Sequence, residues 1–410
     1  MELSTGFAFK SIGFTDGPDG VRLLRGDNVG QGRVRWESAK WWPTADSRDL
    51  DRYLLAEGDV VLAMDRPWIS GGLKHAIVRH TDLPAALVQR VARLRACPGL
   101  DQGFLAAVVA SQDFEDHIWS VITGSAVPHI SGSQILAFPM RRLPPEAEQR
   151  QVAATLAALD DKVESNQRKI TVSHELAASL CQSILGSPTE RWTDAWPTYH
   201  LGDVLSTLEV GRRPAGGIRY EPNGIPSIGA ESIVQAGSFD FSKTKQVSEA
   251  FFAAMRRGHL EHLDVLLYKD GGTPGNLIPH VSAVGHGFPF SVASINEHVY
   301  RLRIQPPYAQ SFLYFWLSSP RLLAEMRRRG TGAAIPGLNS SAVRDLPVPR
   351  PPAHILRNLQ EALDPLLDLI LRSAKESRAC AQMRDVLLPE LLSGRIRVPE
   401  ASEAVESALA

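Results

Sequence analysis

The sequence predicts an α+β fold in which two similar domains are separated by two long antiparallel helices that form a coiled coil. Blocks of similar residues recur along the chain in the same order and at a nearly constant offset. Each copy ends in a proline-rich hinge, which is followed by a long glycine-free segment with a heptad pattern. The length of 410 residues also favours two or three domains, because one domain takes about 150 residues.

The repeat is clearest where glycine and proline restrict the backbone. Gly124-Ser-Ala-Val-Pro128 matches Gly332-Ala-Ala-Ile-Pro336 at an offset of 332 − 124 = 208. Nearer the start of each copy, Asp59-Val-Val-Leu62 matches Asp264-Val-Leu-Leu267 at an offset of 264 − 59 = 205. Short insertions in loops account for the small change in offset. The matches therefore predict two copies of one domain, in which short strands and helices are mixed.

The heptad pattern predicts the two long helices. In residues 146–185 and again in residues 353–392, apolar or small residues recur at alternating steps of three and four, the period of a coiled coil. Both seams are polar in the middle, with Asn166 in the first and Ser373 in the second, which favours a single register. At 1.5 Å per residue, about 40 residues form a rod of about 60 Å.

The chain is predicted to run through six parts. These are a first domain at 1–143, a spacer helix at 144–186, a linker at 187–197, a second domain at 198–350, a second spacer helix at 351–394 and a tail at 395–410. Gly186 and Gly394 are the expected ends of the helices, and Pro365 is expected to kink the second one. The small, acidic tail after Pro399 is expected to be disordered.

Composition excludes several classes of protein. The formal net charge is 44 − 45 = −1, so binding to nucleic acid would need local basic patches rather than bulk charge. Cys97, Cys181 and Cys380 are far apart and form no Cys-x-x-Cys pair, so neither a structural zinc site nor a disulfide framework is expected. The chain has no signal-peptide pattern and no apolar run near 20 residues, so we expect a cytoplasmic protein that does not enter a membrane.

Taken together, these features resemble the specificity (S) subunit of type I restriction–modification systems. The resemblance covers nearly the whole chain. It is carried by the two Gly-x-x-x-Pro blocks that lead into long helices, by Asp264-Val-Leu-Leu-Tyr-Lys-Asp-Gly-Gly-Thr273, and by Leu387-Leu-Pro-Glu-Leu-Leu-Ser-Gly-Arg-Ile396. It implies two target recognition domains that each read one half of a bipartite site in double-stranded DNA.

The resemblance also implies partners. The long helices would act as a spacer and dock two methyltransferase (M) subunits, and restriction (R) subunits would complete the complex. The chain itself would be a non-catalytic subunit without a cofactor or a metal. S-adenosylmethionine, ATP and Mg would belong to the partner subunits.

One departure concerns the start of the first copy. Leu201-Gly-Asp-Val204 resembles the usual opening of a recognition domain, but its counterpart would lie before residue 1. Either the start codon is assigned downstream of the true one, or another segment supplies the piece. The resemblance places the C-terminal tail beside the first domain, so Arg395-Ile-Arg-Val398 is a candidate for that segment.

Exposed glycine-rich loops are the candidate DNA contacts, because backbone and side chains can approach a groove closely there. The candidate DNA-binding residues are Arg66, Trp68, Lys74, Arg212, Arg213, Lys269, Thr273 and Asn276. The alternative interpretation of these loops is an ordinary solvated hairpin tip.

Catalytic motifs are weak or missing. Gln305-Pro-Pro-Tyr308 resembles the Asn/Asp-Pro-Pro-Tyr motif of adenine methyltransferases, but glutamine is a poor substitute for its first residue, and no glycine-rich cofactor loop accompanies it. No nucleotide-binding Gly-x-x-x-x-Gly-Lys-Ser/Thr loop is present. Two other functions stay open: a coiled-coil scaffold whose end domains bind protein partners rather than DNA, and a free-standing enzyme.

Overall fold

The computed structural model describes residues 1–17, 20–43, 50–69, 72–123, 128–140, 142–185, 196–217, 223–332 and 335–409. The chain forms two compact units, one of Met1–Lys162 with Cys380–Ala410 and the other of Val163–Ala379. This division cuts through both long helices, so the predicted domain boundaries stay a prediction. Gly186, most of the linker at 187–197, and the inner residues 124–127 and 333–334 of the two Gly-x-x-x-Pro blocks lie outside the described residues.

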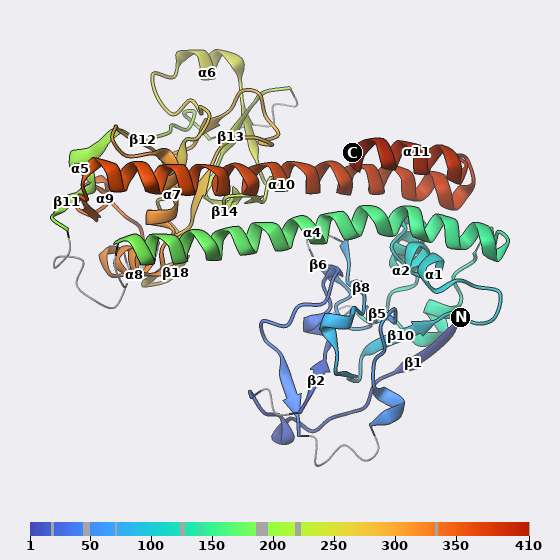
Figure 1. The fold of residues 1–410 in the computed structure, drawn as a ribbon. Helices are drawn as coiled ribbons and strands as arrows, with labels where there is room; N and C mark the ends of the chain where they lie inside the picture. The colour runs from blue at the N-terminus through green and yellow to red at the C-terminus, as the bar shows by residue number, and fades with distance from the viewer. Residues whose placement is uncertain are drawn as a thin grey trace. The chain divides into compact units, whose positions relative to one another are not determined.

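Two small sheets form the centre of the first domain (Figure 1). The larger sheet has the strand order β1-β10-β5-β8-β3, formed by Glu2–Thr5, Val91–Arg95, Val60–Ala63, His75–Ile77 and Gln31–Gly32. The smaller sheet has the order β4-β2-β9, formed by Lys40–Trp42, Val21–Leu24 and Ala85–Leu87. Every residue of β5 is buried, as expected for a continuous apolar strand with neighbours on both sides.

Three short helices follow β10 in the first domain. They are α1 (Gln102–Val109), α2 (Gln112–Val121) and α3 (Gly132–Leu136). Each begins after a side chain that accepts a hydrogen bond from a backbone N–H of the first turn, namely that of Asp101, Ser111 or Ser131. The apolar residues of α1 share one core with β5 and β10, so this helix covers the larger sheet.

The second domain repeats this arrangement. Its larger sheet has the order β12-β22-β17-β20, formed by Leu205–Val210, Val299–Ile304, Val265–Tyr268 and Val281–Ala283. Its smaller sheet has the order β16-β13-β21, formed by Lys245–Val247, Ile225–Ile228 and Ser294–Ile295. The helices α7, α8 and α9 follow at Gln310–Leu317, Pro320–Arg329 and Ser340–Arg344.

Strand directions and offsets show that the two domains are copies. In both smaller sheets the middle strand is antiparallel to one neighbour and parallel to the other, since β2 pairs with β9 as β13 pairs with β21. The helices α2 and α8 start at an offset of 320 − 112 = 208, and α3 and α9 at 340 − 132 = 208. The predicted pair of similar α+β domains is therefore confirmed.

The second domain also has elements that precede or extend these sheets. They are β11 (Thr198–His200), α5 (Leu201–Val204), β14 (Ile233–Gln235), β15 (Ser238–Phe239), α6 (Glu249–Ala254) and β23 (Pro347–Pro349). Strand β11 pairs with β23, which places the domain's opening segment beside its end. In the first domain, β1 pairs with β10 as β12 pairs with β22, and no described strand corresponds to β11.

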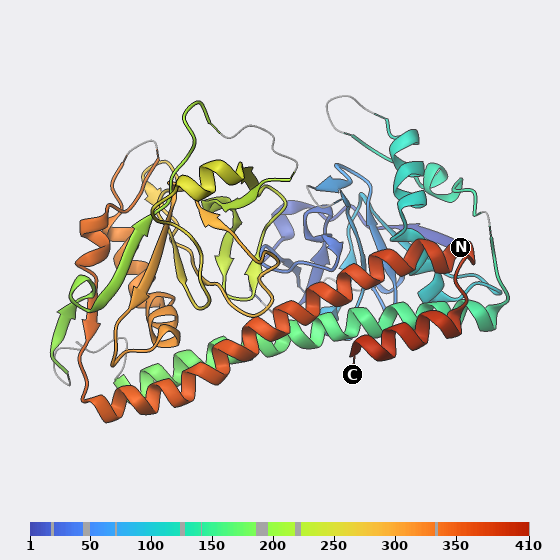
Figure 2. The same cartoon turned by 90° about the horizontal axis from the view of Figure 1, so that it is seen from above.

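The two long helices lie where the heptads predicted them, with α4 at Glu146–Leu185 and α10 at Ala353–Ser393. None of the predicted seam positions is exposed. Within each unit the two helices lie side by side (Figures 1 and 2). In the first unit, the start of α4 meets the end of α10, where Arg384 Nη1 is 2.8 Å from Asp160 Oδ1. In the second unit the opposite ends meet, so the pair is antiparallel.

The helix α10 continues unbroken through Pro365, and the expected kink there stays a prediction. One expectation about the C-terminal part needs correction. The tail is not disordered, because Val398–Leu409 forms a helix, α11, whose Ala401 and Val405 are buried and whose Ser402 hydroxyl lies 3.0 Å from that of Thr155 on α4. No described strand pairs with residues 395–398, so this segment forms no counterpart of β11. Its replacement of the Leu201–Val204 piece, which is helical in the second domain, stays a prediction.

Candidate nucleic-acid interface

A short hairpin projects from the same place in each domain. In the first domain it consists of β6 (Trp68–Ile69) and β7 (Gly72–Leu73), and in the second of β18 (Gly272–Thr273) and β19 (Asn276–Leu277). Both hairpins follow the buried central strand of the larger sheet, and both are only two residues long on each side. Of the predicted contact residues, Trp68, Thr273 and Asn276 lie in these hairpins, and Arg66, Lys74 and Lys269 flank them.

Arg66 and a pair of tryptophans lie at the hairpin of the first domain. Arg66 is exposed and has a φ of 45°, which is the left-handed region. Trp68 donates a hydrogen bond from Nε1 to Glu115 Oε1 at 2.8 Å and meets Trp119 edge to face, with ring centroids 4.8 Å apart. Because Trp119 on α2 is 65% exposed, the two indoles form an aromatic surface beside the hairpin.

Lys74 does not have the exposed position that the sequence suggested. Its side chain is only 7% exposed, because the residue lies between β7 and β8. Burial lowers the pKa of Lys74, the nearby Asp27 opposes that shift, and Arg35 and Arg66 add to it. Contact of Lys74 with DNA stays a prediction, which the burial of its side chain weakens.

The hairpin of the second domain exposes uncharged polar groups. Thr273 and Asn276 are opposite each other across the hairpin and are both exposed. Lys269 is partly buried at the base of the hairpin, where Nζ donates to Glu297 O at 3.3 Å and lies 3.4 Å from Asp270 Oδ2. The three predicted residues therefore occupy the tip and the base of one projection.

Arg212 and Arg213 lie after β12 and are both exposed. Arg213 Nη1 is 3.5 Å from Glu297 Oε1, so Glu297 connects this arginine to Lys269. The structure therefore groups Arg213 with Lys269, and no described residue links Arg212 to this group. Glu297 was missed from the sequence, because nothing local distinguishes it from a solvated acid.

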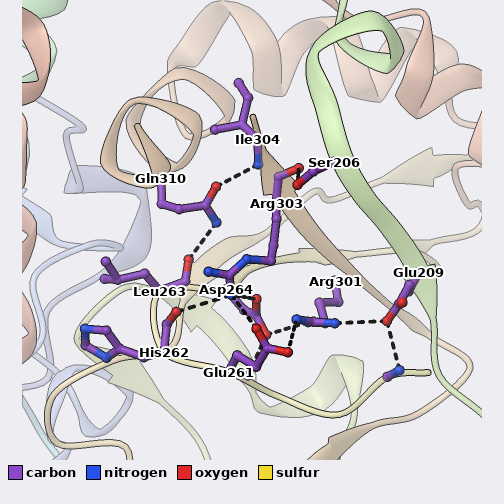
Figure 3. A network of polar contacts seen from close by, with 11 residues as sticks. Ser206, Glu209, Glu261, His262, Leu263, Asp264, Arg301, Arg303, Ile304 and Gln310 are labelled. Carbon is purple, nitrogen blue, oxygen red and sulfur yellow. Dashed lines mark hydrogen bonds and ion pairs between the residues drawn. The ribbon is translucent and has the colours of Figure 1, made fainter. Parts of the chain in front are cut away.

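A buried polar framework connects the strands of the larger sheet in the second domain (Figure 3). Asp264 is fully buried and accepts hydrogen bonds from Arg301 Nε at 2.6 Å and Arg303 Nη1 at 2.7 Å. Burial raises the pKa of Asp264, and the hydrogen bonds from Arg301 oppose that shift. Glu209 on the edge strand completes the network through Arg301 Nη1 at 3.1 Å.

The first domain contains part of the same framework. Asp59 is 3% exposed and accepts two hydrogen bonds from Arg95, at 2.5 and 2.9 Å, where Arg95 corresponds to Arg303 at an offset of 303 − 95 = 208. In both domains the acid directly precedes the central strand and the arginine lies on the strand paired with it, so the pair joins these two strands. The acid of this pair is part of the repeated sequence blocks that begin at Asp59 and Asp264.

A glutamine completes the duplicated framework. Gln102 Nε2 donates to Gly58 O at 2.8 Å, and Gln310 Nε2 donates to Leu263 O at 2.9 Å. The two carbonyl residues have φ values of 85° and 64°, so the same left-handed turn occurs in both domains. The two glutamines thus hold the same turn in each domain, and both hairpins extend from the same local structure.

The motif Gln305-Pro-Pro-Tyr308 has a structural explanation. Tyr308 is buried, and its hydroxyl donates a hydrogen bond to Pro349 O at 2.9 Å. Among the described residues, no group of three or more His, Cys, Asp or Glu side chains gathers as a metal ion would require. In the same part of the chain, no helix combines the length and apolar character needed to cross a membrane.

Comparisons with known proteins were made for the sequence and for the fold. No family model matches the chain. The chain is 37% identical over 157 residues to the type I restriction enzyme EcoAI specificity subunit of Escherichia coli, covering 38% of this chain and 26% of that protein. It is 31% identical over 170 residues to the MjaVIII specificity subunit of Methanocaldococcus jannaschii, covering 41% of this chain and 39% of that protein. The matched part therefore spans well under half the length of these relatives.

The fold agrees with these relatives. The crystal structure of the type I restriction–modification S subunit from M. genitalium aligns with 95% of this chain and 93% of its own, at a TM-score of 0.55 and 16% sequence identity. The resemblance to type I specificity subunits that the sequence suggested is thus confirmed by curated homologues and by the fold.

Proposed function

We propose that this chain, whose curated homologues are type I restriction enzyme specificity subunits, is a sequence-specific DNA-binding subunit that reads a bipartite duplex target. The observation that carries the proposal is the duplicated scaffold with a projecting hairpin in each domain. Sequence is read by side chains at base edges, and short projections reach a groove. Two projections of different composition would read two different half-sites.

The charged residues around the hairpins support a DNA partner. The chain has a net charge of −1, so affinity for phosphates must come from local cations. Arg66 in the first domain and Arg212 in the second are exposed, and each lies within or next to a glycine-containing loop. Such side chains would hold the domains in register on the phosphate backbone, while the hairpin tips contact bases.

The long helices would set the distance between the half-sites and dock the partner subunits. About 40 residues in each helix correspond to a rod of about 60 Å, which exceeds the ~34 Å repeat of B-DNA. Val172, Leu176 and Leu369 are exposed apolar residues on these helices and suit a protein partner. Two methyltransferase subunits and restriction subunits would bind there and supply S-adenosylmethionine, ATP and Mg chemistry, and this chain would take no catalytic part.

The direct test is binding of duplex DNA by the full chain in complex with its methyltransferase partner, measured across a salt series. We expect the affinity for DNA to fall steeply with salt. The slope of log K against the logarithm of the salt concentration should be near −0.9 for each phosphate contacted. The double variant Arg212→Ala with Arg213→Ala is expected to make that slope less negative by one to two units. The matched control is Arg372→Ala, which removes an exposed arginine that pairs with Asp368 on α10.

The outcomes separate DNA reading from the scaffold alternative. A slope that changes in the double variant and not in the control supports DNA contact by the second domain. Binding of partner proteins without any salt-dependent binding of DNA would overturn the proposal and favour the scaffold.

A further inference from the structure

One aspartate lies at the same place at the base of each hairpin. Asp65 comes two residues after β5, and Asp270 comes two residues after β17, an offset of 270 − 65 = 205. Each forms an isolated antiparallel bridge with a residue at the end of a Gly-x-x-x-Pro block, His129 in the first domain and Gly337 in the second. Each aspartate therefore connects the base of its hairpin to the end of the Gly-x-x-x-Pro block in the same domain.

The backbone around these aspartates is hydrogen-bonded alike in both copies. Arg66 N donates to Pro128 O at 2.8 Å, and Gly271 N donates to Pro336 O at 2.9 Å. The backbone just before each hairpin is thus hydrogen-bonded to the proline that ends the Gly-x-x-x-Pro block. A shift of the loop would move the hairpin with it.

The carboxylate adds a third segment to this junction. Asp65 accepts a hydrogen bond from Arg90 Nη1 at 3.1 Å and pairs with His129 Nδ1. Asp270 pairs with His298 Nδ1 at 2.8 Å. Arg90 and His298 occupy equivalent positions at the start of β10 and β22, since 298 − 90 = 208. Each carboxylate therefore holds the start of the next strand against the hairpin base.

In the second domain the junction reaches the candidate DNA contacts. His298 Nε2 is 3.5 Å from Glu297 Oε1, the same oxygen that lies 3.5 Å from Arg213 Nη1. Lys269 Nζ lies between Asp270 and the Glu297 carbonyl. The positions of both cations thus depend on one small network around Asp270.

Charge gives the reason to assign a positioning role. An acidic side chain on a DNA-facing surface is repelled by phosphates, yet Asp65 and Asp270 remain 31% and 22% exposed. Each carboxylate pairs with a cation, Arg90 or Lys269, and fixes its orientation. A carboxylate can do this without touching DNA itself. Arg66 and Arg90, which flank Asp65 in this junction, both have positive φ, so the backbone there is held in a costly conformation.

We infer that Asp65 and Asp270 are positioning residues, each of which holds the base of the hairpin that reads one half of the target. This inference rests on the proposed function. Loss of the Asp65 carboxylate would remove the partner of Arg90 and of His129, and loss of the Asp270 carboxylate would remove the partner of His298 Nδ1 and one of the two acceptors of Lys269. The hairpin base would then be held less firmly. Because each aspartate serves one domain, each variant should relax the recognition of one half-site and leave the other half unchanged.

The test is to map N6-methyladenine in a host that carries the full complex with wild-type chain, Asp65→Asn or Asp270→Asn. We expect each variant to methylate sites with about tenfold less discrimination at bases of one half, a different half for each aspartate. The two variants are matched controls for each other. Unfolding of each purified complex, followed by circular dichroism, shows whether the domain still folds.

A second pair of variants keeps the test decisive if the asparagine variants unfold. His298→Asn retains a side-chain donor for Asp270 and is expected to keep the wild-type target, whereas His298→Leu removes the donor and is expected to relax the second half only. Unchanged targets in all four variants, or equal loss at both halves in a folded variant, would overturn the inference. A wild-type complex without any gene-dependent bipartite methylation would overturn the proposed function, and this inference with it.

Discussion

His174 on α4 accepts a hydrogen bond at Nε2 from the hydroxyl of Tyr314 on α7, with 2.7 Å between the two atoms. The Nδ1 atom of His174 lies 2.9 Å from Ile170 O, so Nδ1 carries the proton and the ring is neutral. The same hydroxyl accepts the backbone N–H of Ala236 at 3.0 Å. One histidine thus ties the spacer helix to two parts of the second domain.

This pair predicts a pH dependence of stability. Burial lowers the pKa of His174, so below about 6.5 the unfolded chain binds a proton that the folded chain does not bind. The contribution of His174 to the unfolding free energy therefore falls as the pH falls through that value and is restored as the pH rises. Denaturant unfolding of wild type and His174→Gln between pH 5 and 8 checks this, and an equally steep pH dependence in both would contradict it.

The buried framework predicts a large loss of stability in either domain. Asp264→Asn leaves Arg301 and Arg303 without their anionic partner, which costs about 3 kcal/mol of unfolding free energy. Asp59→Asn is expected to cost a similar amount through Arg95. Asp368→Asn on α10 is the control, because its exposed pair with Arg372 contributes about 0.5 kcal/mol. Equal losses in all three variants would refute a special role for the framework.

Cysteine reactivity tests the packing of α4. Burial raises the pKa of Cys181 to about 12, whereas Cys97 is exposed. At pH 8, a thiol with that pKa is ionised to only about 0.01%, so alkylating reagents should label Cys97 and spare Cys181 until the protein unfolds. Peptide mass mapping after brief alkylation gives the answer, and rapid native labelling of Cys181 would mean that α4 is not packed as described.

The features that the sequence predicted well are periodic or repeated. The seams of α4 and α10 follow from a local 3.5-residue pattern, because burial of Leu159 or Leu363 needs only a partner helix with the same period. The duplicated framework follows from the Asp59 and Asp264 blocks, since the same local sequence meets the same strand in both copies.

The features that were missed depend on contacts far apart in the chain. The tail helix α11 buries Ala401 and Val405 and contacts α4 through the hydroxyls of Ser402 and Thr155. Nothing in the acidic sequence of the tail indicates that contact. Lys74 is buried by strands that the glycine-rich loop pattern did not predict. The junctions at Asp65 and Asp270 join three segments each, so no single window of sequence contains them.

The length of the spacer helices predicts the gap between the two half-sites. Removal of one heptad from each of α4 and α10 keeps the seam in phase and shortens the rod by roughly 10 Å, so the gap in the target should shrink by about 3 base pairs. Removal of four residues from each helix breaks the phase and serves as the control, which should abolish methylation. An unchanged gap in the heptad variant would show that the helices do not measure it.

The most direct test of DNA reading by two domains is a map of N6-methyladenine across the host genome, with and without this gene. The account predicts a two-part target with a fixed gap, methylated only when the gene is present. The same methylation pattern in both strains, or a gene-dependent target without two separated halves, would contradict it.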